Sequence, residues 1–250
     1  MSENLNQNEN EQWKIFNELT QKAENGDAEA QFDLAWYYMV GHGVEFDPSQ
    51  GVEWFRKSAE QGNIPSLHEM IRCCAYGTGV ARSLSDAIKW LRKTAKQGDP
   101  MALNHLKTYL LPIDGEDPVK AAEQGDADAQ CSLGRIYLFG LDCKKDFVKA
   151  MEWLQKAAEQ GHPQAQVDLS QCYRTGGDEV KQDLAKSMEW LTKATNQGFA
   201  QAQYQMGECY MNGEGVEQDP AKAKEWYQKA AAQGDEEAEK ALEELHAAGK

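Results

Sequence analysis

Glycine returns along this chain at an almost constant interval, and this periodicity limits the possible folds more than any other feature. The intervals between successive marker glycines are 36, 36, 27, 36, 37 and 36 residues. The marker glycines are Gly26, Gly62, Gly98, Gly125, Gly161, Gly198 and Gly234. A tryptophan lies eight residues before five of them. A period of this length predicts a tandem array of short units that stack on one another.

The stretch from Gly198 to Gly234 contains one complete unit. A helical pattern comes first, the turn Gly-Glu-Gly-Val follows at 213–216, and Asp219-Pro220 begins a second helical run that carries Trp226. Aspartate caps a helix N-terminus, and proline is pre-set for the first helical position, where no backbone donor is needed. Each unit is therefore predicted to be a helical hairpin, and the chain an all-α solenoid of antiparallel helix pairs with no β-sheet.

The domain prediction follows from the same markers. Residues 1–10 are polar and are expected to form a disordered tail, and residues 11–250 are expected to form a single repeat domain. Its parts are a capping helix at 11–25, repeats 26–61, 62–97, 98–124, 125–160, 161–197 and 198–233, and a capping helix at 234–250. The truncated third repeat lacks the tryptophan, and its short second helix is expected near Asp117-Pro118. A kink or gap is predicted here, either from erosion of the repeat or as a notch for a partner.

Charge and hydropathy exclude several classes of partner. The chain has 26 basic and 41 acidic residues, a net charge of −15, which repels nucleic acid and anionic membrane surfaces. The first ten residues lack a basic start and an apolar run, so no Sec signal is predicted, and no apolar stretch is long enough to span a bilayer. We expect a cytoplasmic monomer, with export by another route left open.

Cysteine and histidine do not form a recognisable metal or cofactor motif. The six cysteines are Cys73, Cys74, Cys131, Cys143, Cys172 and Cys209, with no C-x-x-C spacing among them. We expect reduced thiols that act as small core residues. The five histidines form no i, i+4 pair with another histidine or a cysteine, so no metal and no cofactor are predicted. His68 and His105 lie at neighbouring positions of adjacent repeats, close to Cys73, which leaves a weak hydrolytic site as an alternative.

The first helix of each repeat carries two kinds of position. After the opening glycine, position 4 holds a small residue, position 8 holds Leu or Met, and position 12 holds mostly Tyr. At about 100° per residue these three positions form one packing stripe. Positions 6, 10 and 13 point nearly the opposite way and vary between repeats, as expected of a partner-binding groove or of an ordinary solvated face. The candidate groove residues are Phe32, Trp36, Met39, His68, Arg72, Thr108, Arg135, Leu138, Gln171, Arg174, Tyr204, Glu208 and Met211. Phe32, Trp36 and Met39 could instead pack under the N-terminal helix, and the repeated tryptophans are predicted to hold the units together.

The motifs of the 198–234 unit resemble the Sel1-like repeat of the tetratricopeptide-like superfamily. They are a spread A-x-x-L-G-x-x-Y pattern at 202–210, G-x-G-V at 213–216, Asp219-Pro220, A-x-x-W at 223–226 and K-A-A-x-x-G at 229–234. The resemblance covers nearly the whole chain from about Gln12. It implies a right-handed superhelix whose first helices line the concave side. Secreted members that resemble this chain carry paired cysteines, and that pairing is missing here.

The leading functional hypothesis is a non-catalytic scaffold or adaptor that binds a peptide or protein domain in the concave groove. Arg72, Arg135 and Arg174 would bind acidic groups of the partner, and the apolar candidates would anchor it. No catalytic residue is predicted. The resemblance also leaves open a toxin-neutralising immunity protein and a virulence or signalling regulator, and the acidic charge would suit a basic toxin surface. A weak hydrolase is the remaining alternative.

Overall fold

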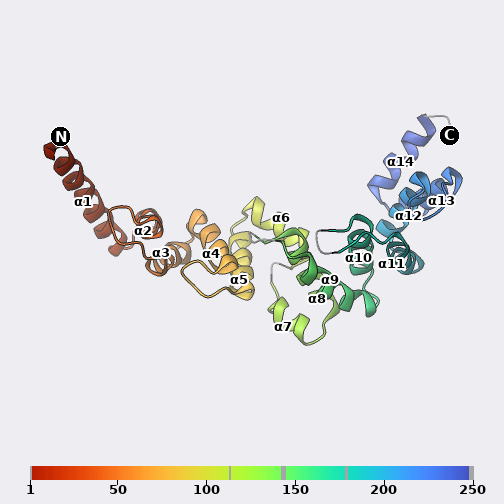
Figure 1. The fold of residues 1–250 in the computed structure, drawn as a ribbon, viewed down its shortest axis with the longest axis horizontal. Helices are drawn as coiled ribbons and strands as arrows, with labels where there is room; N and C mark the ends of the chain where they lie inside the picture. The colour runs from red at the N-terminus through yellow and green to blue at the C-terminus, as the bar shows by residue number, and fades with distance from the viewer. Residues whose placement is uncertain (1, 113, 142–144, 178–179, 248–250) are drawn as a thin grey trace. The chain divides into compact units, whose positions relative to one another are not determined.

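The computed structural model describes residues 2–112, 114–141, 145–177 and 180–247. Over these ranges the chain consists of helices joined by connections, without a β-strand (Figure 1). It divides into two compact units, one containing α1 to α6 and the other α7 to α14. The all-helical repeat fold predicted from the glycine period is confirmed. The division falls between α6 and α7, inside the truncated repeat, where the sequence predicts a kink or gap within one repeat domain.

The first unit is a series of helices that pack in chain order. Its helices are α1 (Ser2–Glu24), α2 (Ala28–Val40), α3 (Pro48–Glu60), α4 (Ile64–Tyr76), α5 (Leu84–Lys96) and α6 (Pro100–Thr108). The pairs α2–α3 and α4–α5 form hairpins, α1 packs on α2, and α6 packs on α5. Residues 2–10, predicted to be a disordered tail, lie in α1, which begins at Ser2 and not near residue 11. The stretch 2–24 contains no glycine or proline, so no residue in it interrupts the helix.

The second unit repeats the same arrangement. Its helices are α7 (Pro118–Glu123), α8 (Ala127–Phe139), α9 (Phe147–Glu159), α10 (Pro163–Thr175), α11 (Leu184–Asn196), α12 (Ala200–Asn212), α13 (Pro220–Ala231) and α14 (Glu236–Ala247). Three hairpins, α8–α9, α10–α11 and α12–α13, follow one another, with α7 on α8 and α14 on α13. Ala238 and Leu245 of α14 cover Tyr227, so this helix closes the core at its end of the unit. The predicted turns at 140–143 and 176–178, and Cys143, lie partly or wholly outside the described residues.

The helix boundaries follow from the capping residues. Asp47 accepts hydrogen bonds from the backbone N–H groups of Ser49 and Gln50, and Asp219 accepts one from Lys222, as the Asp-Pro pairs predicted. The preceding helices, α2 and α12, end at Gly41 and Gly213, which have φ of 70° and 71° in the left-handed region. In these two hairpins, the residues that end the first helix and begin the second therefore lie at matching positions of the repeat.

The core of the second unit lies between the two helices of each hairpin and between neighbouring hairpins. Ala202 and Met206 of the predicted packing stripe are buried in α12, and their counterparts in the other first helices are buried as well. The residues that follow the repeated tryptophans are almost fully buried: Phe55, Leu91, Leu154, Leu191 and Tyr227. Leu110 departs from the stripe, because α6 ends at Thr108 and leaves this side chain 44% exposed with a φ of 57°.

A ladder of glutamine side chains joins the repeats, and the sequence analysis missed it. A glutamine at the end of one second helix donates a hydrogen bond to a glutamine of the first helix in the same repeat. The pairs are Gln61–Gln31 (2.8 Å), Gln160–Gln130 (2.8 Å), Gln197–Gln166 (2.9 Å) and Gln233–Gln203 (2.8 Å). Gln31, Gln130 and Gln166 also donate to a carbonyl of the preceding helix, at Ala23, Ala122 and Ala158. These buried amides are paired with partners in fixed register, which aligns one repeat on the next.

One arginine holds the unusual connection of the truncated repeat. Arg92 of α5 donates to the carbonyl oxygens of Pro112 (3.1 Å), Gly115 (3.0 Å) and Glu116 (2.9 Å). The guanidinium has several N–H groups in a fixed plane, which suits a loop that offers carbonyls from different directions. Arg92 therefore fixes the path of the chain between α6 and the end of the first unit.

We expect Arg92→Lys to loosen this connection. Lysine keeps the charge but cannot reproduce the planar set of donors, so the variant should lose about 1 to 2 kcal/mol of stability. Limited proteolysis should cleave the variant faster within 110–117, and Arg82→Lys, an exposed arginine before α5, is the matched control. Equal cleavage of Arg92→Lys and wild type would contradict this role.

Candidate partner-binding surface

In the second unit, the first helices α8, α10 and α12 share one face. A buried ion pair links α8 to α10 on this face. Arg135 of α8 donates to both oxygens of Asp168 on α10, at 2.9 and 2.7 Å. Their side chains are only 15% and 10% exposed, and Gln164 also donates to Asp168. Burial raises the pKa of Asp168, while Arg135 opposes that rise. Arg135 was predicted to bind a partner's acidic group, but in the structure it neutralises an acidic group of this chain.

A second arginine on the same face is more open. Arg174 of α10 donates to Gln171 Oε1 at 3.1 and 2.7 Å, and to Glu214 in the turn after α12 at 2.8 Å. The Arg174 and Glu214 side chains are 34% and 38% exposed. The guanidinium is therefore held in one orientation but can still be reached from solvent.

Helix α12, the first helix of the last repeat, contributes side chains that are partly buried by packing. Tyr204 stacks obliquely on Tyr227 of α13, with ring centroids 5.7 Å apart, and the Tyr227 hydroxyl donates to Glu208. Met211 packs against the cluster that α13 and α14 form. Tyr204, Glu208 and Met211 are all half-buried.

Leu138 of α8 is also half-buried, whereas its neighbour Phe139 is 42% exposed and lies 5.2 Å from the Arg135 guanidinium. The sequence analysis did not select Phe139.

In the first unit, the apolar candidates pack against their own hairpin. The rings of Phe32 and Trp36 lie 5.7 and 5.5 Å from the ring of Phe55 in α3. The N-terminal helix instead places Phe16 on Tyr37 and Tyr38, so the alternative that α1 packs on Phe32 and Trp36 receives no support from these ring contacts. Met39 is half-buried and lies next to Gly51, where an added Cβ would stand 2.7 Å from its Cγ.

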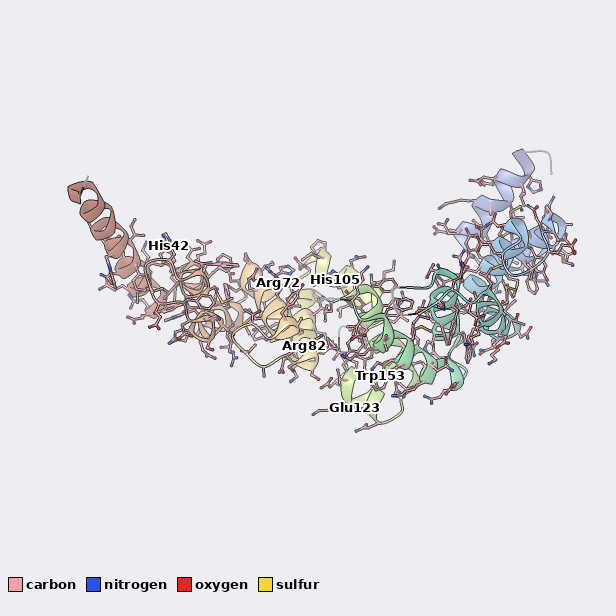
Figure 2. The ribbon with its side chains drawn as sticks, viewed as in Figure 1. His42, Arg72, Arg82, His105, Glu123 and Trp153 are labelled. Atoms are coloured by element: carbon pink, nitrogen blue, oxygen red, sulfur yellow. The ribbon has the colours of Figure 1, made fainter. Side chains whose placement is uncertain are left out.

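The polar candidates of the first unit lie on α4 and α6. Arg72 is exposed (Figure 2) and pairs with Glu69 on its own helix at 3.0 Å. His68 lies 3.4 Å from Asp99, the N-cap of α6. Thr108 is the last residue of α6 and is half-buried. The structure therefore links His68 to the next repeat and leaves Arg72 as the most open cation among the candidates.

The predicted division of each first helix into a packed face and an outward face is wrong at several positions. Four residues at the positions expected to face outward are buried: Ala75, Leu111, Cys131 and Val167. Val167, for example, lies in one cluster with Leu191 of its own hairpin and Ala202 of the next repeat. In a stack, a first helix is covered by its partner helix and by neighbouring repeats, so more than one stripe becomes core.

The repeated tryptophans are less buried than a purely structural role predicts. Only Trp190 is buried, and the other four of the set are half-buried. A lysine three residues later lies over each ring, at 3.8, 3.9, 3.7 and 3.8 Å from the centroids of Trp54, Trp153, Trp190 and Trp226. Lys93 is further from Trp90, at 5.1 Å. The lysines cover the outer faces of the rings and attract them through the ring quadrupole.

The residues of the alternative hydrolytic site lack an activated nucleophile. Cys73 is buried, and burial raises the pKa of its thiol to about 12. His68 faces Asp99, and His105 stacks on Tyr109 at 5.7 Å between ring centroids. A catalytic cysteine requires a lowered pKa, so this arrangement does not favour nucleophilic chemistry. The free, buried state predicted for the cysteines holds for Cys73, Cys74, Cys131, Cys172 and Cys209.

Among the residues that the structure describes, no three or more His, Cys, Asp and Glu side chains gather in a way that could hold a metal ion. No helix in this part of the chain has the length and apolar character needed to cross a membrane.

Hairpins of constant length, a repeating core and first helices with variable exposed residues define a helical repeat protein. The Sel1 repeat family profile matches residues 28–63, 72–99, 127–162, 163–199 and 200–235. These matches cover more than half of the chain, which therefore belongs to the Sel1 repeat family. They skip the truncated repeat, in agreement with its shortened second helix α7. Members of this family generally bind protein partners and are typically non-catalytic.

The chain is also similar to several solved structures. A Sel1 repeat protein from Oxalobacter formigenes is 26% identical, with a TM-score of 0.50 over 89% of this chain and 78% of that chain. The protective antigen c5321 of uropathogenic Escherichia coli is 32% identical with a TM-score of 0.47, over 92% of this chain and 51% of that chain, so this chain spans about half of its length. The immunity protein Pa5087 of Pseudomonas aeruginosa is 18% identical with a TM-score of 0.38, over 82% and 81% of the two chains. Comparison with curated proteins gives no match.

Proposed function

We propose that this protein is a non-catalytic adaptor that binds a peptide or protein domain on the α8–α10–α12 face of its second unit. One observation carries the proposal. On these three helices most of the buried residues repeat from unit to unit, whereas the half-buried residue at position 13 differs: Leu138 on α8, Arg174 on α10 and Met211 on α12. A surface that varies on a constant scaffold is suited to the recognition of one particular partner.

Arg174 is the best-placed recognition residue on this face. Its guanidinium is held by Gln171 and Glu214, so little side-chain freedom is lost when a partner binds. A carboxylate of the partner would compete with Glu214, which is 38% exposed and can turn toward solvent. Phe139, which is 42% exposed, would add an apolar anchor, and aromatic and arginine side chains are enriched among binding hot spots.

Arg135 is unsuitable as a probe of this function. Its removal would leave Asp168 charged and buried, so a loss of binding could reflect damage to the fold. The informative variant is Arg174→Ala combined with Phe139→Ala, since both side chains reach solvent.

The test has two steps: the wild-type protein serves as bait in cells of the native organism, and the captured partner is then purified and its affinity for the wild type and the double variant is compared. We expect a partner to be captured by the wild type and identified by mass spectrometry, and the purified partner to bind the Phe139→Ala, Arg174→Ala variant at least about tenfold more weakly by calorimetry. Circular dichroism checks that the variant retains its helices.

Lys181→Ala removes an exposed cation from the connection before α11 and serves as the charge-matched control. Its affinity for the purified partner should equal that of the wild type. Equal affinity of the double variant and the wild type would disprove the assignment of the partner to this face.

A further inference from the structure

A cavity of about 480 Å³ lies between α3, α4 and α5 in the first unit. Its apolar wall is formed by Met70, Cys74, Val80 and Trp90. Pockets of this size hold small ligands when an apolar wall is combined with a few polar groups.

The cavity lies where the other complete repeats place a tyrosine. Cys74 occupies position 12 of the first helix in its repeat. At the same position the other complete repeats carry Tyr38, Tyr137, Tyr173 and Tyr210. Tyr210 packs at the core that contains Met206, together with Val216 and Trp226. Met206, Val216 and Trp226 are the counterparts of Met70, Val80 and Trp90. The residues of the cavity wall therefore correspond to residues that pack around a tyrosine ring in the last repeat, and this repeat lacks that ring.

The charges around the cavity also differ from those of the other repeats. At the position of Asp86, the three repeats of the second unit have a lysine whose ammonium group lies 5.3 to 5.5 Å from the tyrosine ring. Asp86 instead pairs with Lys89 at 2.9 Å, and Lys89 replaces the glutamate found at this position in the other complete repeats. Both the missing ring and the exchanged charges belong to this one repeat.

Two cations at the cavity are incompletely engaged. The buried Nε atom of Arg56 has no hydrogen-bond partner within the described part of the chain, and the Arg56 guanidinium lies 3.6 Å from Glu53. Lys93 lies 5.1 Å from the Trp90 ring, further than in the other repeats, and donates weakly to the Glu60 carbonyl at 3.4 Å. A buried donor without a partner is unfavourable, and an anion that accepted its hydrogen bond would remove that penalty.

We propose that this cavity binds a small aromatic carboxylate. The aromatic ring replaces the missing tyrosine ring between Met70, Val80 and Trp90, and the carboxylate accepts a hydrogen bond from Arg56 Nε, with Lys93 nearby. Burial raises the pKa of Cys74, so the thiol stays neutral and forms part of the apolar wall. Binding is non-covalent and independent of the partner-binding face of the second unit.

The test uses calorimetry on the full chain with three probes. We expect 3-(4-hydroxyphenyl)propionate to bind with a Kd on the order of 0.1 to 1 mM at one site. The neutral analogue 4-ethylphenol should bind about tenfold more weakly, because it lacks the charge-assisted hydrogen bond. A blocked Tyr-Glu dipeptide tests the second source of the same chemistry, an aromatic side chain beside a carboxylate in a polypeptide.

Two variants separate ligand binding from folding. Cys74→Tyr supplies the residue that the other repeats use here, so it should fold as well as the wild type and abolish binding of all probes. Arg56→Gln should weaken binding of the carboxylate about tenfold and leave 4-ethylphenol unchanged, with Arg82→Gln as the control for an exposed arginine. The proposal is overturned if no probe binds the wild type, or if Cys74→Tyr binds the carboxylate as the wild type does.

Discussion

Gly79→Ala is expected to unfold the first unit at much lower denaturant concentration than the wild type. Gly79 has a φ of 70°, and a Cβ added there would stand 2.2 Å from the carbonyl oxygen of Pro48 at the start of α3. The contact is with backbone, which cannot rotate away. Left-handed strain of about 1 to 2 kcal/mol and a clash of about 1 to 3 kcal/mol together predict a loss of roughly 2 to 5 kcal/mol. Amide hydrogen exchange should rise in α3 to α5 and stay unchanged in α10 to α13.

Gly43→Ala is the matched control, because Gly43 occupies the same position of the turn in the preceding repeat. Its φ is 71°, but an added Cβ would meet nothing within 4 Å. This variant should lose only about 1 to 2 kcal/mol, from left-handed strain alone. If the two alanine variants were equally stable, the close approach of this turn to the preceding hairpin would not explain the glycine.

The fold was predictable because its boundaries are marked by residues with specific backbone requirements. All seven marker glycines have positive φ, from 79° at Gly198 to 101° at Gly125. Few other residues adopt this conformation at low energy, so the chain must place glycine wherever a second helix ends. The Asp-Pro starts are local signals of the same kind, and α3 and α13 begin where they predicted.

The candidate surface was predicted less well, because it depends on contacts between repeats. Periodicity places Cys131 and Val167 on the outward side of their helices, but neighbouring hairpins bury both. The ion pair of Arg135 with Asp168 joins residues 33 positions apart, and the helical period of one element carries no information about such a partner. The glutamine ladder did leave a signal, since glutamine recurs before the marker glycines and at position 5 of four first helices.

Arg135→Ala is the second variant for which a large effect is expected. The Asp168 side chain is 10% exposed and would keep the hydrogen bond from Gln164 but lose both bonds from Arg135. Breaking a buried pair by removal of one member leaves an uncompensated charge, which predicts a loss of about 3 to 5 kcal/mol at neutral pH. Denaturant unfolding followed by circular dichroism measures this loss. Arg72→Ala, which removes an exposed arginine paired within one helix, should lose less than about 1 kcal/mol.

The effect of Arg135→Ala should depend on pH in a direction that identifies its cause. Burial already raises the pKa of Asp168 above its unfolded value, and loss of the guanidinium raises the pKa further. The folded variant then binds a proton that the unfolded chain has released, so its stability falls as pH rises from about 4 through the folded-state pKa. Acidification should restore part of the loss, and Asp168→Asn added to Arg135→Ala should remove this pH dependence. A loss that stayed constant across this range would mean that Arg135 stabilises the unit through packing on Phe139 and not through Asp168.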